Sequence, residues 1–351
     1  MTAAGNDSPL TQTQTHTHTH THTHTHTHRH TNTHTHTHTT THTHTHTHTT
    51  THHTTTHTTT YTHTDLVDLA DPAALNTLLR GKSFTHVFDN FAKDVKTVET
   101  VAGKAKAEWK VKNYAYVSSA GMYESKVAQP MVEIMQTKTT GQVCSTVGLF
   151  WLYIRSLLTL ETTGQREVEM YLEAQGLPWT AFRPQYIYGP KTNKRDYLDW
   201  FFHRITRDRV CPLPGDGKQK ASVSHVEDVA AMMTAVVGKE DVARGQVFNC
   251  GTETCVTYAD ICKLVGKTVG KEAKIMGYNP KDFELPKGAF PFRNTAFYVS
   301  PAKARNVLGW RSTRTLEGDM DWYYESYKAA GQLKKEIDFS ADDMILAPVR
   351  R

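Results

Sequence analysis

The stretch LVDLADPAALNTLLRGKSFTHVFDN, residues 66–90, decides the fold of this chain. Its first apolar residues end before Asp71-Pro72, a pair typical of a helix N-terminus, because aspartate accepts from free backbone N–H groups and proline fits the first turn. The apolar residues that follow have helical spacing, and residues 86–88 read His-Val-Phe, as in a strand. The stretch therefore predicts the end of a strand, a helix and a second strand.

The residues that follow continue this alternation. A helix is predicted from about Lys93 to Trp109 and a strand at YAYV, residues 114–117. Residues 166–182, REVEMYLEAQGLPWTAF, predict a helix that leads into a strand. Strands that alternate with helices form a parallel sheet covered on both faces. We therefore expect an α/β fold with a doubly wound parallel sheet and a smaller C-terminal α/β lobe from about residue 190.

Ahead of Asp65 the sequence is a tract of threonine and histidine, which alternate almost strictly from Thr11 to Thr64. Such a tract has too little apolar surface to offset the entropy of ordering, so disorder is predicted for residues 1–64 and a folded domain for residues 65–351. The histidines could collect zinc, nickel or copper ions. A translated dinucleotide repeat without evolved function is the simpler interpretation, and a faulty gene model is a third.

Residues 131–165 are predicted to be an insertion. Residues 139–142 and 162–165 both read Thr-Thr-Gly-Gln, and removal of the second copy with the residues between them would leave a continuous helix. The apolar run at residues 147–160 is too short for a membrane span and contains Arg155. A retained intron, a genuine surface insertion and an amphipathic partner-binding helix remain alternatives.

The charge of the chain favours a polyanionic partner. The net charge is +5 and the pI about 8.8, which permits association with phosphate backbones. Residues 191–220 hold eight Lys or Arg against four Asp or Glu, interleaved with aromatic residues, and predict a nucleic-acid face. A second basic cluster runs from Arg293 to Arg314. Five cysteines without a CxxC pair argue for reduced thiols and against zinc.

Four motifs resemble, in order, landmarks of the extended short-chain dehydrogenase/reductases: VSSAGMY at 117–123, FRPQYIYGP at 182–190, SHVEDVA at 224–230 and VLGW at 307–310. In register over about 200 residues, they imply that family's Rossmann-like fold. Within that superfamily PLPGDGKQ, AFPFRN and the tail KKEIDFSADDMIL resemble the chloroplast stem-loop-binding proteins. This resemblance covers nearly everything after Asp65 except residues 131–163.

The resemblance implies a plastid RNA-binding protein that stabilises or processes transcripts. It implies stem-loop and ribosomal RNA as partners, association with the ribosome or with itself, no membrane partner, and a divalent-metal-dependent endonuclease activity that is attributed to some members. The N-terminus shows no transit-peptide pattern, so a chloroplast location rests on the resemblance. The alternatives are an NAD-dependent nucleotide-sugar epimerase/dehydratase and the nonfunctional product of a damaged gene model.

The sequence departs from a working oxidoreductase of this fold, which needs a tyrosine with a lysine four residues later for proton transfer. Counted back from Glu169, these positions hold Glu161 and Gln165. A G-x-x-G-x-x-G turn, through which the backbone approaches a pyrophosphate, does not occur before Asp65. We therefore expect that the N-terminal βαβ unit, the oxidoreductase activity and NAD(P) binding are lost.

Candidate site residues follow from these comparisons. Ser119 is a vestigial catalytic candidate, against the simpler interpretation that it caps the next turn. Asp199 and two neighbouring aspartates could hold Mg²⁺ for RNA cleavage, against ion pairs along their helix; the metal ligands stay unknown. Asp68 and Leu69 are a vestigial cofactor-binding pair. The residues predicted to contact RNA phosphates or bases are Arg183, Tyr186, Tyr188, Lys191, Lys194, Arg195, Arg204, Arg207 and Arg209.

Overall fold

The computed structural model describes residues 38–48, 57–124, 128–135, 164–192 and 194–347. The chain divides into two compact units, Met1–Leu66 and Val67–Arg351.

The first unit contains a two-stranded sheet of β1 (His38–His48) and β2 (His57–Val67). These strands lie within the tract for which composition alone predicts disorder. Residues 1–37 and 49–56 lie outside the described residues, so the prediction for the tract as a whole stays a prediction. Most of the predicted insertion, residues 136–163, also lies outside them.

The second unit is built on a sheet of four parallel strands in the order β10-β5-β4-β3. The strands are β3 (His86–Asp89), β4 (Asn113–Val117), β5 (Trp179–Pro184) and β10 (Gln246–Cys250). The sheet confirms the predicted α/β fold and the strands expected at residues 86–88 and 114–117.

The first helices begin at the predicted caps. In α1 (Pro72–Leu78), Asp71 Oδ1 accepts from two backbone N–H groups, at 2.9 and 3.1 Å. α2 (Val95–Lys104) begins with a reciprocal capping box and continues into the π-helical turn η1 (Ala105–Trp109). Together α2 and η1 occupy the helix predicted from Lys93 to Trp109.

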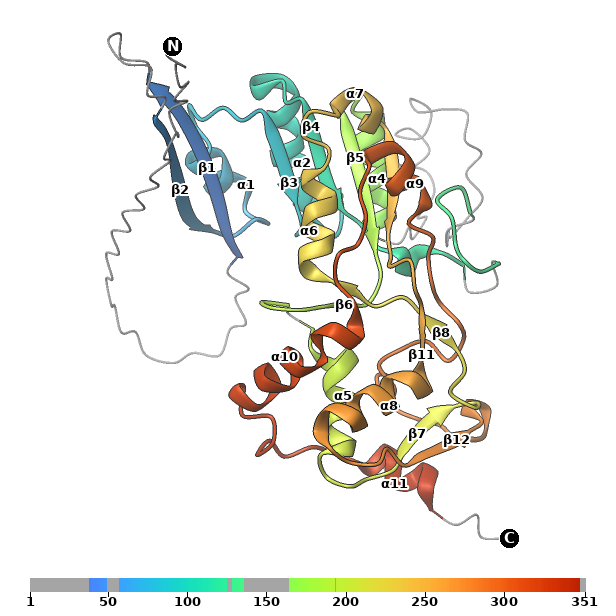
Figure 1. Cartoon of the computed structure of the whole chain (residues 1–351). Coiled ribbons are helices and arrows are strands. Elements are labelled where there is room, and N and C mark those ends of the chain that lie inside the picture. Colours follow the sequence, from blue (N-terminus) through green and yellow to red (C-terminus); the bar gives the residue numbers. More distant parts are fainter. Residues whose placement is uncertain (1–37, 49–56, 125–127, 136–163, 193, 348–351) are drawn as a thin grey trace, which may run out of the picture. The chain divides into compact units, whose positions relative to one another are not determined.

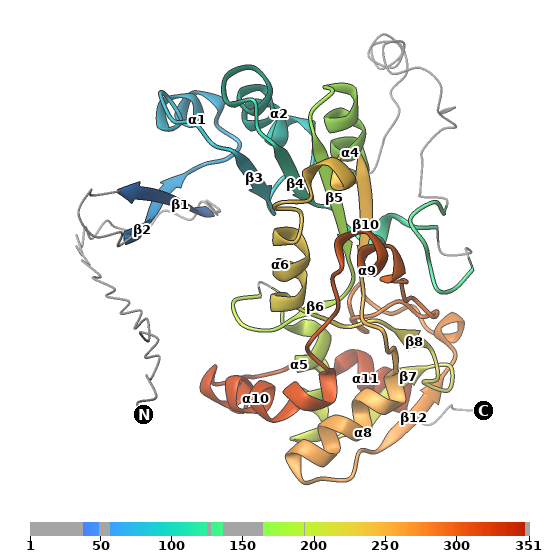
Figure 2. The ribbon, with the colours of Figure 1, turned by 45° about the horizontal axis from the view of Figure 1, so that its top comes forward.

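Helices cover both faces of this sheet (Figures 1 and 2). On one face α1, α2 and α4 (Gly164–Ala174) pack around Tyr114, and on the other α6 (Val226–Thr234) and α9 (Ala302–Leu308) pack near Ala115. Successive side chains of a strand point to opposite faces, so neighbouring residues of β4 belong to different cores. This is the doubly wound arrangement.

The smaller C-terminal lobe has its own core. α5 (Asp196–Ile205), α8 (Tyr258–Val269) and α10 (Leu316–Ala329) pack around Phe201 and Phe202, which are fully buried. The remaining elements of the second unit are η2 (Ala120–Met122), β6 (Ile187–Tyr188), β7 (Cys211–Pro214), β8 (Lys220–Ala221), β9 (Ser224–His225), α7 (Glu240–Ala243), β11 (Val256–Thr257), β12 (Ile275–Tyr278), η3 (Pro280–Asp282) and α11 (Ser340–Leu346). Among the described residues, no helix has the length and apolar character needed to span a membrane.

Candidate functional site

A doubly wound sheet binds its ligands outside the carboxyl ends of its strands. In this protein Ser118 and Ser119 follow β4, Gln185 follows β5, and Asn249 lies at the end of β10. Side chains from three adjacent strands therefore meet at one edge of the sheet.

A buried ion pair between α4 and β5 lies at this edge. Glu169 of α4 is 0% exposed and Arg183 of β5 is 3% exposed. The Arg183 Nε donates to Glu169 Oε1 at 2.9 Å and Nη2 donates to Oε2 at 2.6 Å. Ser118 and Arg166 donate to the same carboxylate at 2.6 and 2.9 Å. Burial alone would raise the pKa of Glu169, but the hydrogen bonds and charge of Arg183 outweigh it and hold that pKa below its usual value.

Arg183 also connects this pair to β10. Its Nη1 donates to the Tyr123 hydroxyl at 3.0 Å, and that hydroxyl donates to Asn249 Oδ1 at 2.8 Å. Burial raises the pKa of Tyr123, although Arg183 opposes the shift. The phenol therefore keeps its proton at neutral pH. The predicted RNA contact at Arg183 is not favoured by this geometry, because its guanidinium is buried and hydrogen-bonded inside the protein.

Ser119 and the predicted cofactor pair have structural roles. Ser119 Oγ accepts from the Gly121 N–H at 3.0 Å and caps η2, so the capping interpretation of this serine is confirmed. Asp68 Oδ1 accepts from the Ala70 N–H at 2.9 Å in the turn before α1. Leu69 packs against the core beneath α1 and α2.

A cavity of about 260 Å³, the Ser119 cavity, opens beside these strand ends. Its polar and aromatic lining includes Ser119, Gln185, Tyr186, Tyr197, Phe292 and Arg293. Tyr186 has φ +35°, a backbone conformation that residues other than glycine rarely adopt and that occurs most often at functional sites. Its hydroxyl accepts from the Arg293 backbone N–H at 3.0 Å. Tyr186 is half-buried and lines a cavity, which keeps its predicted role in base stacking open.

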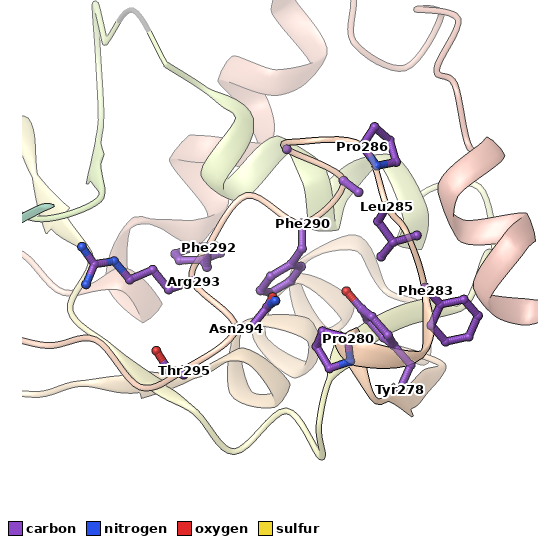
Figure 3. Close-up of a pocket in the computed structure, with 12 residues that line it drawn as sticks. Tyr278, Pro280, Phe283, Leu285, Pro286, Phe290, Phe292, Arg293, Asn294 and Thr295 are labelled. Carbon is purple, nitrogen blue, oxygen red and sulfur yellow. The ribbon is translucent and has the colours of Figure 1, made fainter. Parts of the chain in front are cut away.

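A second cavity of about 450 Å³ shares Phe292 and Arg293 with the first. Figure 3 shows the Arg293 side chain pointing away from Phe283 and Leu285, which lie on the far side of the second cavity. Its Nη2 donates to the Gly121 carbonyl at 2.7 Å. The guanidinium thus belongs with the Ser119 cavity.

Three arginines of the predicted RNA face bind the C-terminal segment of the chain, residues 332–346. Arg204 Nη2 donates to Asp342 Oδ1 at 2.7 Å, and both side chains are almost fully buried. Arg207 donates to three backbone carbonyls of the segment, and Arg209 forms an ion pair with Asp343. These contacts engage part of each guanidinium inside the protein, and a contact of the three arginines with RNA phosphates stays a prediction.

Tyr188 and Asp199 are also engaged inside the lobe. Tyr188 is 2% exposed and donates to Asp319 at 2.8 Å, a geometry that does not favour its predicted role in base stacking. Asp199 is 4% exposed and accepts from the Tyr323 hydroxyl at 2.8 Å and from Arg195 Nε at 3.1 Å. Among the residues that the structure describes, no three His, Cys, Asp or Glu side chains come together as a metal site. The geometry therefore does not favour Mg²⁺ at Asp199, and the ion pair with Arg195 agrees with the simpler interpretation.

The lysines of the predicted face keep the exposure that an RNA contact requires. Lys191 and Lys194 are both exposed, and Lys194 Nζ lies 4.7 Å from the centre of the Tyr197 ring. Their predicted role thus remains compatible with the structure.

The model of the NAD dependent epimerase/dehydratase family matches residues 16–251. The chain belongs to that family. The chain is also 34% identical over 285 residues to the Arabidopsis thaliana protein named chloroplast stem-loop binding protein of 41 kDa b, and the match covers 80% of this chain and 68% of that protein. This similarity confirms the resemblance that the motifs indicate.

Enzymes on this scaffold are more distant. A trifunctional UDP-glucose 4,6-dehydratase, epimerase and reductase of Arabidopsis thaliana is 29% identical over 167 residues, 45% of this chain and 23% of that protein. The solved UDP-glucuronic acid 4-epimerase of Bacillus cereus has a TM-score of 0.55 at 16% identity, over 75% of this chain and 79% of its own. An epimerase of Methanothermobacter thermautotrophicus has a TM-score of 0.56 at 17% identity, over 76% and 79% of the two chains. These structures establish the fold.

The sequence singled out Ser119 and Tyr186 of the cavity lining but not Gln185 or Arg293 as part of one site. Arg293 was expected only in a separate basic cluster, and Gln185 carried no signal beyond its position inside the FRPQYIYGP motif. Both depend on packing between the sheet and the loop at residues 279–296, which no local pattern shows.

Proposed function

We propose that this protein binds stem-loop RNA in plastids, where it stabilises or processes transcripts. The observation that carries the proposal is its similarity to the protein named for chloroplast stem-loop binding. That relative is similar over 80% of this chain, whereas the named dehydratase is similar over 45%.

The carboxyl edge of the sheet supports a binding role. The carboxylate of Glu169 is already saturated by Arg183, Ser118 and Arg166. A carboxylate with four donors on its two oxygens has no free acceptor with which to take a substrate proton. Exposed lysines beside the adjoining cavity, in contrast, can meet phosphates without rearrangement.

The residues of this chain do not fit the pyrophosphate of a dinucleotide. The sequence has no glycine between Asn6 and Arg80, so the residues ahead of α1 cannot make the glycine turn that brings backbone N–H groups to a pyrophosphate. The loss of NAD(P) binding remains a prediction, and no step of the proposed function uses this cofactor.

RNA cleavage would be a further step. If Asp199 held a catalytic metal, Asp199→Asn would remove Mg²⁺-dependent cleavage and leave RNA binding intact. The partners of Asp199 favour the opposite result, in which cleavage by the wild type, if any, persists in the variant. A nuclease assay with and without Mg²⁺ on both proteins makes this comparison.

The direct test of the proposed function is a binding assay of the full chain with an RNA hairpin. The proposal is supported if the hairpin half-saturates the protein at submicromolar concentration and if excess UDP-glucose and NAD leave that concentration unchanged. Turnover of UDP-glucose with NAD, together with no RNA binding, would instead establish the alternative, a nucleotide-sugar epimerase/dehydratase, which the family match supports.

A further inference from the structure

We propose that the Ser119 cavity accepts one unpaired nucleotide of the bound RNA, turned out of its loop. This inference rests on the proposed function and assigns it a site. It concerns a single base and its phosphate, whereas RNA binding as such also involves the exposed lysines.

Two polar groups in the cavity lining have unused hydrogen-bonding capacity. Gln185 is 2% exposed; its Nε2 donates to the Phe297 carbonyl at 2.6 Å, whereas its Oε1 is buried and has no hydrogen-bond partner among the described residues. Arg293 Nη1 is likewise buried and unpartnered within the described part of the chain. Buried polar atoms without partners are rare because they cost free energy. The cavity therefore offers one acceptor and one donor to a ligand.

A nucleobase matches this pattern. Base edges carry hydrogen-bond donors and acceptors side by side, and unpaired bases also stack on aromatic rings. The Tyr186 ring lies 4.9 Å from Tyr197, 4.5 Å from Phe292 and 5.5 Å from Phe297, each in an edge-on arrangement. Tyr186 and Tyr197 are only half-buried, which leaves ring surface for a base.

Two cations belong to the cavity. Arg293 lines it, and Lys194 lies over the ring of Tyr197, which also lines it. These cations complement the phosphates on either side of an extruded base. The volume of about 260 Å³ lies just below the range of small-molecule sites, which begins at roughly 300 Å³, so the cavity is expected to take a single base rather than a larger ligand.

The test uses the full chain and two RNAs. One is a hairpin with a fluorescent adenine analogue in its loop, and the other is a duplex of the same stem with the analogue paired. The wild type is expected to quench the loop analogue and to bind the hairpin more tightly than the duplex. Tyr197→Leu is expected to weaken hairpin binding about tenfold and to leave duplex binding unchanged, because one stacking contact is lost.

The matched control for this variant is Tyr324→Leu. Tyr324 is also half-buried, and Lys328 lies over its ring at the same 4.7 Å, but it does not line the cavity. Its substitution is expected to leave both affinities and the quenching unchanged. Equal losses in the two tyrosine variants would contradict the inference.

A second variant, Arg293→Gln, tests the polar contact. It is expected to abolish the quenching and to reduce the salt dependence of hairpin binding by about one phosphate contact. The control is Arg244→Gln. Arg244 is exposed and lies at the opposite, amino end of the sheet, where the backbone N–H of the next residue, Gly245, donates to the Trp179 carbonyl.

Equal hairpin and duplex binding by all variants would overturn the inference while RNA binding itself stands. No binding of either RNA would overturn both. If UDP-glucose displaced the hairpin from the wild type but not from the cavity variants, the cavity would be assigned to a sugar nucleotide instead.

Discussion

At the residue scale, the carboxyl edge of the sheet depends on one arginine and one glutamate. Arg183 reaches Glu169, Tyr123 and the Glu133 carbonyl from a position in β5 that is 3% exposed. A charge this deeply buried is tolerated only while its partner remains, because an uncompensated buried ion is costly. The same contacts do not favour Arg183 as an RNA ligand.

Glu169→Gln is therefore expected to lower the free energy of unfolding by about 3–5 kcal/mol. The amide keeps the shape of the side chain but leaves the Arg183 guanidinium without a counterion. The control, Glu253→Gln, removes an exposed partner of Arg305 and is expected to cost less than about 1 kcal/mol. Urea denaturation of the three proteins makes the comparison. Equal losses would show that the buried pair is no more important than a surface pair.

His203 makes stability depend on pH. Burial, followed by the charge of Arg207, lowers the pKa of His203 from 6.5 to about 4, and its Nδ1 lies 2.8 Å from the Tyr327 hydroxyl. Because the folded pKa is below the unfolded one, protonation favours unfolding. The contribution of the neutral ring is complete above about pH 6.5 and is lost as pH falls toward about 4.

In His203→Gln the loss of stability between those two pH values is expected to be smaller than in the wild type. Urea denaturation at a series of pH values measures it. The other groups that titrate in this range are the same in both proteins, so the difference isolates His203. Identical pH profiles would contradict this assignment.

At the element scale, the C-terminal segment gives three arginines of the basic run partners inside the protein. Arg204, Arg207 and Arg209 sit at the end of an amphipathic helix and are spaced as a phosphate-binding row would be. Their partners lie more than 120 residues later in sequence, for example 138 residues for Arg204 and Asp342. The local sequence shows the run of basic residues but not the distant partners that bind them.

Neighbouring aspartates of α11 test this anchoring. Asp342→Asn is expected to lower the free energy of unfolding by about 3 kcal/mol, because its partner Arg204 is buried. Asp343→Asn, at the next position, is expected to cost less than about 1 kcal/mol, because its side chain is 65% exposed. Hydrogen exchange should show earlier opening of residues 332–346 only in the first variant. The reverse order of effects would contradict the contacts described for this segment.

The helices and strands themselves were largely predictable. Asp71-Pro72 identified the start of α1, and apolar spacing identified α2, α4 and the strands β3, β4 and β5, since these signals are local. The cavity was not predictable, because Ser119, Gln185 and Arg293 meet only through tertiary packing. The difference between the exposed Lys191 and Lys194 and the buried Arg183 and Arg204 also depends on tertiary packing, which the local sequence does not show.

At the scale of the whole molecule, the fold is that of the epimerase family, but the chain has no glycine turn ahead of α1. Saturating NAD is therefore expected to leave the midpoint of thermal unfolding unchanged, since only a ligand that binds the native state raises it. A rise that grows with NAD concentration would show that another part of the chain holds the dinucleotide.

The central claim is that this scaffold binds RNA through its positive charge. The most direct measurement is the affinity of the full chain for an RNA hairpin over a range of salt concentrations near pH 8, where ordinary histidines are neutral. We predict that the logarithm of the binding constant falls linearly with the logarithm of salt concentration, by roughly 0.7–0.9 for each phosphate contact. An affinity that is the same at low and high salt would contradict the account.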